Sequence, residues 1–133
     1  MKRAILIAIG SAAAFWALPA NAVPSSFQQS CTDIKLTTAG GTATITASCR
    51  KADGTPIPAS LNLKNLTNFN GKLTLNPEDP AASFALTCDA AKLDTTTVTL
   101  SARCKDARGV LKPATSVVLE NIGNFNGQLK YAQ

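Results

Sequence analysis

The sequence predicts an all-β domain built from two copies of one antiparallel module, and three observations support this prediction. Apolar and polar residues alternate with a period of two in short segments such as 43–49 and 98–104, with threonine at many intervening positions. No segment after residue 22 has a long helical period. Finally, an ordered set of residues occurs twice: Phe27, Cys31, Cys49 and Asn-Phe-Asn-Gly at 68–71 return as Phe84, Cys88, Cys104 and the same run at 124–127. Such duplication predicts that a ligand site exists in two related copies.

The first residues are typical of a secretory signal. A basic start, Met1-Lys2-Arg3, precedes an apolar run over 4–18 and an Ala-x-Ala sequence at 20–22. The apolar run is shorter than the roughly 20 residues that a membrane-spanning helix needs, which argues against an anchor. We therefore expect a signal peptide over 1–22, cleaved after Ala22, and a secreted or periplasmic protein of bacterial type.

The remaining residues are enough for one domain. Removing 22 of the 133 residues leaves 111, so we expect a single domain over 23–133 with two repeats, at about 27–75 and 84–131. Loss of Lys2 and Arg3 leaves 11 basic and 8 acidic residues, a net charge of +3. Such a mild charge argues against a nucleic-acid partner, and no transmembrane segment is expected in the mature chain.

All four cysteines follow the signal, so we expect disulfides. Four cysteines allow three connectivities, and the duplication favours the local one, Cys31 with Cys49 and Cys88 with Cys104, since each module then repeats its own bridge. With no histidine and no Cys-x-x-Cys, neither a metal site nor a cofactor is predicted.

Within each repeat the elements follow in the same order. A hairpin joins the two cysteines, turning at Gly40-Gly41 in the first copy and at the shorter 93–95 in the second. Turns at 53–56 and 106–109 follow. Residues 61–66 and 117–122 then predict a strand end running into about one helical turn, before the Asn-Phe-Asn-Gly turn and a last strand. The proline-containing linker 76–82 could act as a hinge, which predicts a monomer or a domain-swapped dimer.

The ordered double set of Phe-x3-Cys, a second cysteine and Asn-x-Asn-Gly-x-Leu resembles the cyanovirin-N homologue family of sugar-binding proteins, from Phe27 to Tyr131. The resemblance implies a duplicated, pseudo-twofold, cyanovirin-N-like fold of antiparallel strands and hairpins with two intra-repeat disulfides. It implies that strands of each repeat complete the other half. It also implies metal-independent recognition of mannose-rich glycans at one pocket per half.

The resemblance also implies residues for each pocket. The first pocket would use Gln29, Ser30, Arg50, Ala52, Asn124, Phe125 and Asn126. The second would use Asn68, Phe69, Asn70, Ser83, Thr87 and Asp106, together with the residues that follow Asp106. The second is favoured, because the donor-only Arg50 stands where the best-known member of the family has an acidic acceptor, and Ala52 brings no polar side-chain atom where that member has one.

Other interpretations of these residues stay open. Asn-Gly is favoured wherever a turn needs positive φ, so the two runs could be turn chemistry alone. Phe69 and Phe125 are predicted as core residues, with an exposed platform for a sugar face as the alternative, and Phe27 and Phe84 as core anchors.

Two other functions remain alternatives to sugar recognition. A basic cluster after each second cysteine could bind acidic polysaccharide. It comprises Arg50, Lys51, Arg103, Lys105, Arg108 and Lys112. A structural or interaction protein that keeps the fold without binding sugar is the other alternative. An enzyme is not predicted, because the sequence lacks the histidine and free thiol of common nucleophilic sites, and no pair of carboxylates recurs in both repeats.

Overall fold

The structure is a computed structural model that describes residues 23–132; the predicted signal peptide over 1–22 lies outside the described residues. Residues 23–132 form ten strands and two short 3-10 helices. In chain order these are η2 (Phe27–Gln29), β1 (Cys31–Ala39), β2 (Thr42–Arg50), β3 (Pro56–Asn62), β4 (Leu66–Phe69), β5 (Lys72–Leu75), η3 (Ser83–Leu86), β6 (Cys88–Asp94), β7 (Thr99–Cys104), β8 (Thr115–Val118), β9 (Ile122–Phe125) and β10 (Gln128–Tyr131). No helix among these residues is long and apolar enough to cross a membrane.

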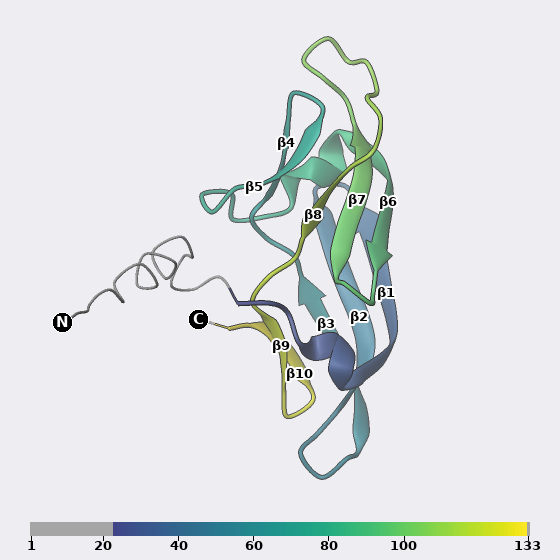
Figure 1. The fold of residues 1–133 in the computed structure, drawn as a ribbon, viewed down its shortest axis with the longest axis vertical. Helices are drawn as coiled ribbons and strands as arrows, with labels where there is room; N and C mark the ends of the chain where they lie inside the picture. The colour runs from purple at the N-terminus through teal and green to yellow at the C-terminus, as the bar shows by residue number, and fades with distance from the viewer. Residues whose placement is uncertain (1–22, 133) are drawn as a thin grey trace, which may run out of the picture.

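Every strand pairing is antiparallel, which confirms the predicted all-β fold. Each repeat supplies a three-stranded sheet, β1–β2–β3 or β6–β7–β8, and a separate two-stranded hairpin, β4–β5 or β9–β10. Figure 1 shows the long strands β1, β2, β6 and β7 running along the long axis of the molecule, with the short hairpins towards opposite ends.

The two repeats exchange their short hairpins. Hairpin β4–β5 of the first repeat packs against β7, β8 and η3 of the second, and hairpin β9–β10 of the second packs against β3 and η2 of the first. The backbone N–H of Leu73 on β5, for example, donates to the hydroxyl of Thr115 on β8 at 2.9 Å. The expectation that strands of each repeat complete the other half is therefore confirmed, and each half contains residues from both repeats.

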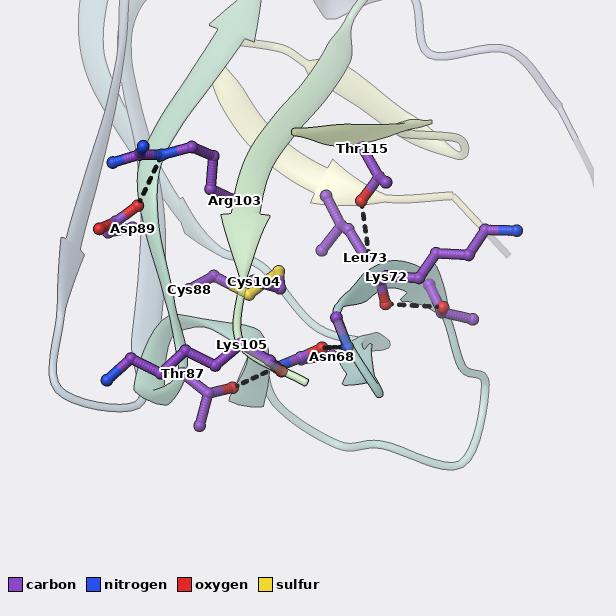
Figure 2. Close-up of a disulfide and its surroundings, with 12 residues drawn as sticks. Asn68, Lys72, Leu73, Thr87, Cys88, Asp89, Arg103, Cys104, Lys105 and Thr115 are labelled. Carbon is purple, nitrogen blue, oxygen red and sulfur yellow. Dashed lines mark hydrogen bonds and ion pairs between the residues drawn. A yellow bond between two sulfur atoms is a disulfide. The ribbon is translucent and has the colours of Figure 1, made fainter. Parts of the chain in front are cut away.

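Both predicted disulfides are present. Cys31 pairs with Cys49 and Cys88 with Cys104, and each pair is directly opposed across its hairpin, with 4.0 Å between the Cα atoms. Each bridge therefore closes the open end of one hairpin, β1–β2 or β6–β7. Figure 2 shows the second bridge.

All four phenylalanines of the repeats are predicted to lie in the core, and two of them do. Phe27 and Phe84 are fully buried, as expected. Phe69, however, is 72% exposed and Phe125 46% exposed, so the prediction that they are core residues is wrong. The reason is strand alternation: Leu66 on β4 faces the core, so Asn68 shares its face and Phe69 must point to the other side.

The helical turns lie elsewhere than predicted. Residues 61–66 form the end of β3, a bend and the start of β4. The helical turns are instead η2 and η3, each of which is separated by one residue from the first cysteine of its repeat. Each carries a buried phenylalanine, Phe27 or Phe84, towards the core. The need to bury this ring next to a strand that starts at the cysteine explains the tight turn.

The linker between the repeats is held by hydrogen bonds. The carboxylate of Asp79 accepts hydrogen bonds from the hydroxyls of Thr67 and Ser83, both at 2.6 Å, and from the backbone N–H of Ala81 at 3.0 Å. These donors favour the charged form, the Ser83 hydroxyl most strongly, and lower the pKa of Asp79 below its ordinary value. The linker is thereby fastened to both β4 and η3.

Candidate functional site

The two Asn-Phe-Asn-Gly runs form tight two-residue hairpin turns. Asn70 and Gly71 connect β4 to β5 with φ values of 51° and 93°, and Asn126 and Gly127 connect β9 to β10 with values of 54° and 90°. Two successive positive φ values are the signature of a type I′ turn, for which Asn-Gly is the favoured sequence. Turn chemistry therefore explains the second asparagine and the glycine of each run.

The first asparagine of each run ties its hairpin to the opposite repeat. The amide nitrogen of Asn68 donates to the hydroxyl of Thr87 at 2.8 Å and to the backbone carbonyl of Lys105 at 2.9 Å, and its oxygen accepts the N–H of Gly71 at 2.8 Å (Figure 2). Both amide N–H groups are thus in use. We call this three-bond arrangement the asparagine brace; it fixes the hairpin relative to the loop that follows the second cysteine.

The same brace occurs in the other half of the molecule. We call the half that contains hairpin β9–β10 and the β1–β2–β3 sheet the first half, and the half that contains hairpin β4–β5 and the β6–β7–β8 sheet the second half. Asn124 donates to the hydroxyl of Ser30 at 2.8 Å and to the carbonyl of Arg50 at 2.9 Å, and it accepts the N–H of Gly127 at 2.7 Å. Five residues of the first pocket that the resemblance implies therefore lie together: Ser30, Arg50, Ala52, Asn124 and Asn126. Arg50 takes part through its backbone carbonyl, which any residue type provides.

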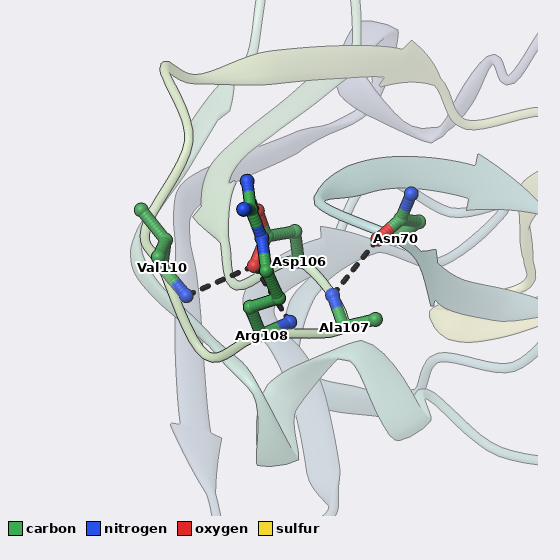
Figure 3. A network of polar contacts seen from close by, with 5 residues as sticks. All are labelled: Asn70, Asp106, Ala107, Arg108 and Val110. Carbon is green, nitrogen blue, oxygen red and sulfur yellow. Dashed lines mark hydrogen bonds and ion pairs between the residues drawn. The ribbon is translucent and has the colours of Figure 1, made fainter.

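The second asparagine of each run contacts the same loop but keeps part of its side chain free. The oxygen of Asn70 accepts the backbone N–H of Ala107 at 2.8 Å (Figure 3), and the oxygen of Asn126 accepts that of Ala52 at 2.8 Å. Within residues 23–132 the side-chain nitrogens of Asn70 and Asn126 have no hydrogen-bond partner. Each can therefore donate two hydrogen bonds to a ligand.

In the second half these groups surround an open hollow of about 390 Å³. The hollow is lined by Asn68, Asn70, Thr87, Lys105, Asp106, Ala107 and Gly109. Four of the six residues predicted for the second pocket are among them. Its walls come from the β4–β5 hairpin of one repeat and the 105–109 loop of the other, so the asparagine brace also sets the width of the hollow.

Asp106 mainly organises its own loop. One carboxylate oxygen accepts the backbone N–H of Arg108 at 2.9 Å and that of Val110 at 3.0 Å (Figure 3). The Arg108 guanidinium lies 4.0 Å from the other oxygen. The side chain of Asp106 is only 8% exposed, so its charge is largely compensated before any ligand arrives.

Some predicted residues lie away from the hollow. Ser83 is not in its lining, because its hydroxyl donates to Asp79. Phe69 is largely exposed and does not line the hollow. At the related site beside β9–β10, Gln29 is exposed on η2. The resemblance places the residues that follow Asp106 in this pocket, and Ala107 and Gly109 do line the hollow, whereas Lys105 is assigned by the sequence only to the basic cluster. The position of Lys105 between Cys104 and Asp106 was the available signal.

These observations can be compared with known proteins. Residues 27–130 match the family model described as the CVNH domain. The chain belongs to the cyanovirin-N homologue (CVNH) family. CVNH proteins are non-catalytic lectins, which confirms the expectation that this chain is not an enzyme.

Solved structures of CVNH proteins share the fold. TbCVNH from T. borchii is 29% identical, with a TM-score of 0.65, and the match covers 80% of this chain and 98% of that one. A microvirin–mannobiose complex is 24% identical (TM-score 0.62, covering 81% and 99%). A MoCVNH3 variant in complex with (N-GlcNAc)4 is 20% identical (TM-score 0.64, covering 81% and 97%). A comparison with curated proteins finds no match.

The two sites of this CVNH domain differ in charge at three equivalent loop positions. These are Lys51, Asp53 and Ile57 in the first half and Asp106, Arg108 and Lys112 in the second. Ile57 and Lys112 both pack on a turn glycine: a Cβ atom added to Gly127 or Gly71 would lie only 2.5 Å from the Ile57 or Lys112 side chain. The position that is apolar in the first half is therefore a cation in the second.

Proposed function

We propose that this CVNH domain is a lectin that binds mannose-type glycans without a metal, with the hollow beside the β4–β5 hairpin as its principal site. The observation that carries the proposal is the arrangement at Asn70, where a free amide nitrogen lies in a hollow whose walls are fixed by the asparagine brace. Among residues 23–132 there is also no group of three potential metal ligands.

The polar groups around the hollow suit a sugar. Pyranose hydroxyls both donate and accept hydrogen bonds, so side-chain amides and hydroxyls can pair with them. The Asn70 amide nitrogen and the Thr87 hydroxyl can donate, while the second lone pair of each asparagine oxygen can accept. Because the brace already holds Asn68 and Thr87 in place, binding loses little further side-chain entropy.

Affinity at one such site should be modest. Each hydrogen bond to a neutral group contributes about 1 kcal/mol net, because water competes for both partners. A few such bonds, after the entropy loss of association, correspond to dissociation constants of roughly millimolar to micromolar. The related site beside β9–β10 would add avidity on a branched glycan or a cell surface.

The test is titration calorimetry with mannobiose and with a branched oligomannose. Asn70→Asp is the informative variant, since it keeps the oxygen that accepts the Ala107 N–H and a residue type that tolerates positive φ, but removes the free amide nitrogen. We expect it to weaken binding of neutral mannobiose about five- to tenfold, the equivalent of roughly 1 kcal/mol. Asn126→Asp makes the same change in the first half and serves as the matched control.

Two results would contradict the proposal. Absence of binding by the folded wild-type protein would leave a CVNH scaffold whose Asn-Gly runs serve only as turns and braces. A loss with Asn126→Asp but not with Asn70→Asp would move the principal site to the first half. Asn68→Ala is unsuitable for this purpose, because it also removes the brace.

A further inference from the structure

The hollow of the second half offers several free hydrogen-bond donors. Both N–H groups of the Asn68 amide are already paired. In the part of the chain that the structure describes, three groups remain able to donate: the Asn70 amide nitrogen, the Thr87 hydroxyl and the Lys105 ammonium. Together they carry six donor hydrogens.

Several acceptor oxygens around the hollow already accept at least one hydrogen bond. The oxygens of Asn68 and Asn70 each accept one backbone N–H, and one oxygen of Asp106 accepts two. The other oxygen of Asp106 faces the Arg108 guanidinium. A neutral sugar hydroxyl both gives and takes hydrogen bonds, whereas a carboxylate, phosphate or sulfate offers acceptor oxygens alone. The six free donor hydrogens therefore suit an anionic group as well as they suit neutral hydroxyls.

The charged side chains around the hollow favour an anionic group. Asp106 is compensated by Arg108 and by two backbone N–H groups. Lys105 lines the hollow and forms no ion pair within residues 23–132, and Figure 2 shows its side chain extending alongside Thr87. At the turn behind the hollow, Lys112 replaces the Ile57 of the first half, with its stem packed on Gly71. The net charge at the hollow is positive once the Asp106–Arg108 pair is discounted.

We propose that the hollow binds a sugar unit that carries an anionic group, with the Lys105 ammonium, the Asn70 amide nitrogen and the Thr87 hydroxyl donating to its charged oxygens. This inference rests on the proposed glycan binding and narrows its substrate class to acidic glycans. Hydrogen bonds between a charged donor and a charged acceptor are roughly twice as strong as neutral ones. An anionic sugar should therefore bind about tenfold more tightly than its neutral counterpart at low salt, with the advantage shrinking as salt screens the exposed lysine.

The experiment is calorimetry on the intact domain at 25 and 300 mM NaCl with matched ligands. Mannose is compared with mannose 6-phosphate, mannose 6-sulfate and mannuronate, which separates the possible sources of the charge. Inorganic phosphate alone tests whether the sugar contributes. Lys105→Gln removes the proposed partner, and Lys35→Gln on the exposed face of β1 makes the same change in charge away from the hollow. Thermal unfolding of each variant verifies the fold.

We expect at least one anionic sugar to bind about tenfold more tightly than mannose at 25 mM NaCl, a ratio falling towards 1 in Lys105→Gln and unchanged in Lys35→Gln. Mannose binding with no preference for any anionic form would overturn this inference and leave the proposed lectin function standing. Binding of no sugar at all would overturn both. Equal losses in the two lysine variants, or equal affinity for inorganic phosphate, would show non-specific attraction and overturn the inference.

Discussion

The two hairpin sites of this CVNH domain share one scaffold but differ in the loop that faces it. Asn68 and Asn124 form the same three hydrogen bonds, to a hydroxyl, a backbone carbonyl and a turn N–H. The facing loop, by contrast, has Asp106 and Arg108 in the second half where the first has Lys51 and Asp53. Duplication has thus preserved the element that positions the wall of each site, while the groups available to a ligand have diverged.

The two exposed phenylalanines differ for a simpler reason. On β4, the residue two positions before Phe69 is Thr67, whose hydroxyl donates to Asp79. Phe125 instead follows Gly123, and its ring lies so close that a Cβ atom on that glycine would be 3.0 Å from the ring edge. The Phe125 ring therefore folds back onto its own strand, which explains its lower exposure and the burial of Gly123.

Removal of one disulfide at a time should have the largest effect on stability. The bridges close loops of 18 and 16 residues, for which loop-closure entropy predicts about 3 kcal/mol each. We expect the pair Cys31→Ala and Cys49→Ala to lower the free energy of unfolding by that amount, and the pair at Cys88 and Cys104 by slightly less, because Cys88 is less buried than Cys31. Urea denaturation measures both.

A loss below about 1 kcal/mol in one half would contradict the idea that each bridge constrains its own half of the unfolded chain. It would also show that the two hairpins that the bridges close contribute unequally to the stability of the fold.

Loss of one asparagine brace should rank next. Asn68→Ala leaves the buried N–H of Gly71 and the carbonyl of Lys105 without their partners, and an unsatisfied buried group costs about 1–3 kcal/mol. Asn124→Ala should cost a similar amount, because the geometry is the same. Chemical denaturation of the two variants, with Asn68→Asp as a control that keeps the acceptor oxygen, tests this equality. Unequal losses would show that the braces are alike in geometry only.

Much of the fold was predictable because its anchors occur twice in the sequence. Cys31, Cys49, Cys88 and Cys104 recur at nearly constant offsets, so local pairing was the economical solution, and the structure confirms it. The Asn-Gly turns were predictable from their need for positive φ. The family resemblance added the exchange of hairpins between repeats, which local periodicity does not contain.

The site was less predictable, because neighbours distant in sequence determine what each side chain does. The resemblance implies Ser83 as a pocket residue, but its hydroxyl donates a hydrogen bond to Asp79. The exposure of Phe69 follows from which face of a four-residue strand meets the core, and so short a strand gives little alternation to decide it. Lys105 belongs to the site because its loop lies opposite the β4–β5 hairpin, a contact between distant parts of the chain.

Truncation of the two exposed phenylalanine rings should lower the free energy of unfolding by less, and by different amounts in the two halves. Phe125→Ala removes a ring that packs on Gly123, and we expect a loss of about 1 kcal/mol in the free energy of unfolding. Phe69→Ala removes a ring that is 72% exposed, so the loss should stay within about 0.5 kcal/mol. Denaturation curves for both variants test the order. A larger loss for Phe69→Ala would show that this ring makes contacts that its exposure does not suggest.

Acid should destabilise the linker that joins the repeats. We expect this to have a smaller effect on stability than disulfide removal, loss of a brace or truncation of an exposed ring. The pKa of Asp79 is lowered from its ordinary value of 3.8, chiefly by the Ser83 hydroxyl and then by that of Thr67. A carboxyl whose pKa is lower in the folded state than in the unfolded state stabilises the fold above the unfolded value. That contribution disappears as the pH falls through the folded value. Asp79 should therefore contribute fully above about pH 5 and progressively less below pH 4.

Melting temperatures between pH 2 and 6 provide the measurement. Asp79→Asn should be less stable than the wild type at pH 6, and its melting temperature should fall less steeply in acid, so the two curves should converge at low pH. The pKa of Asp53 is also lowered, mainly by the Thr55 N–H, but Asp53 lies on an exposed loop, so Asp53→Asn is the matched control with a smaller effect. Parallel curves for the wild type and Asp79→Asn would mean that the linker is held by its backbone hydrogen bonds rather than by this carboxylate.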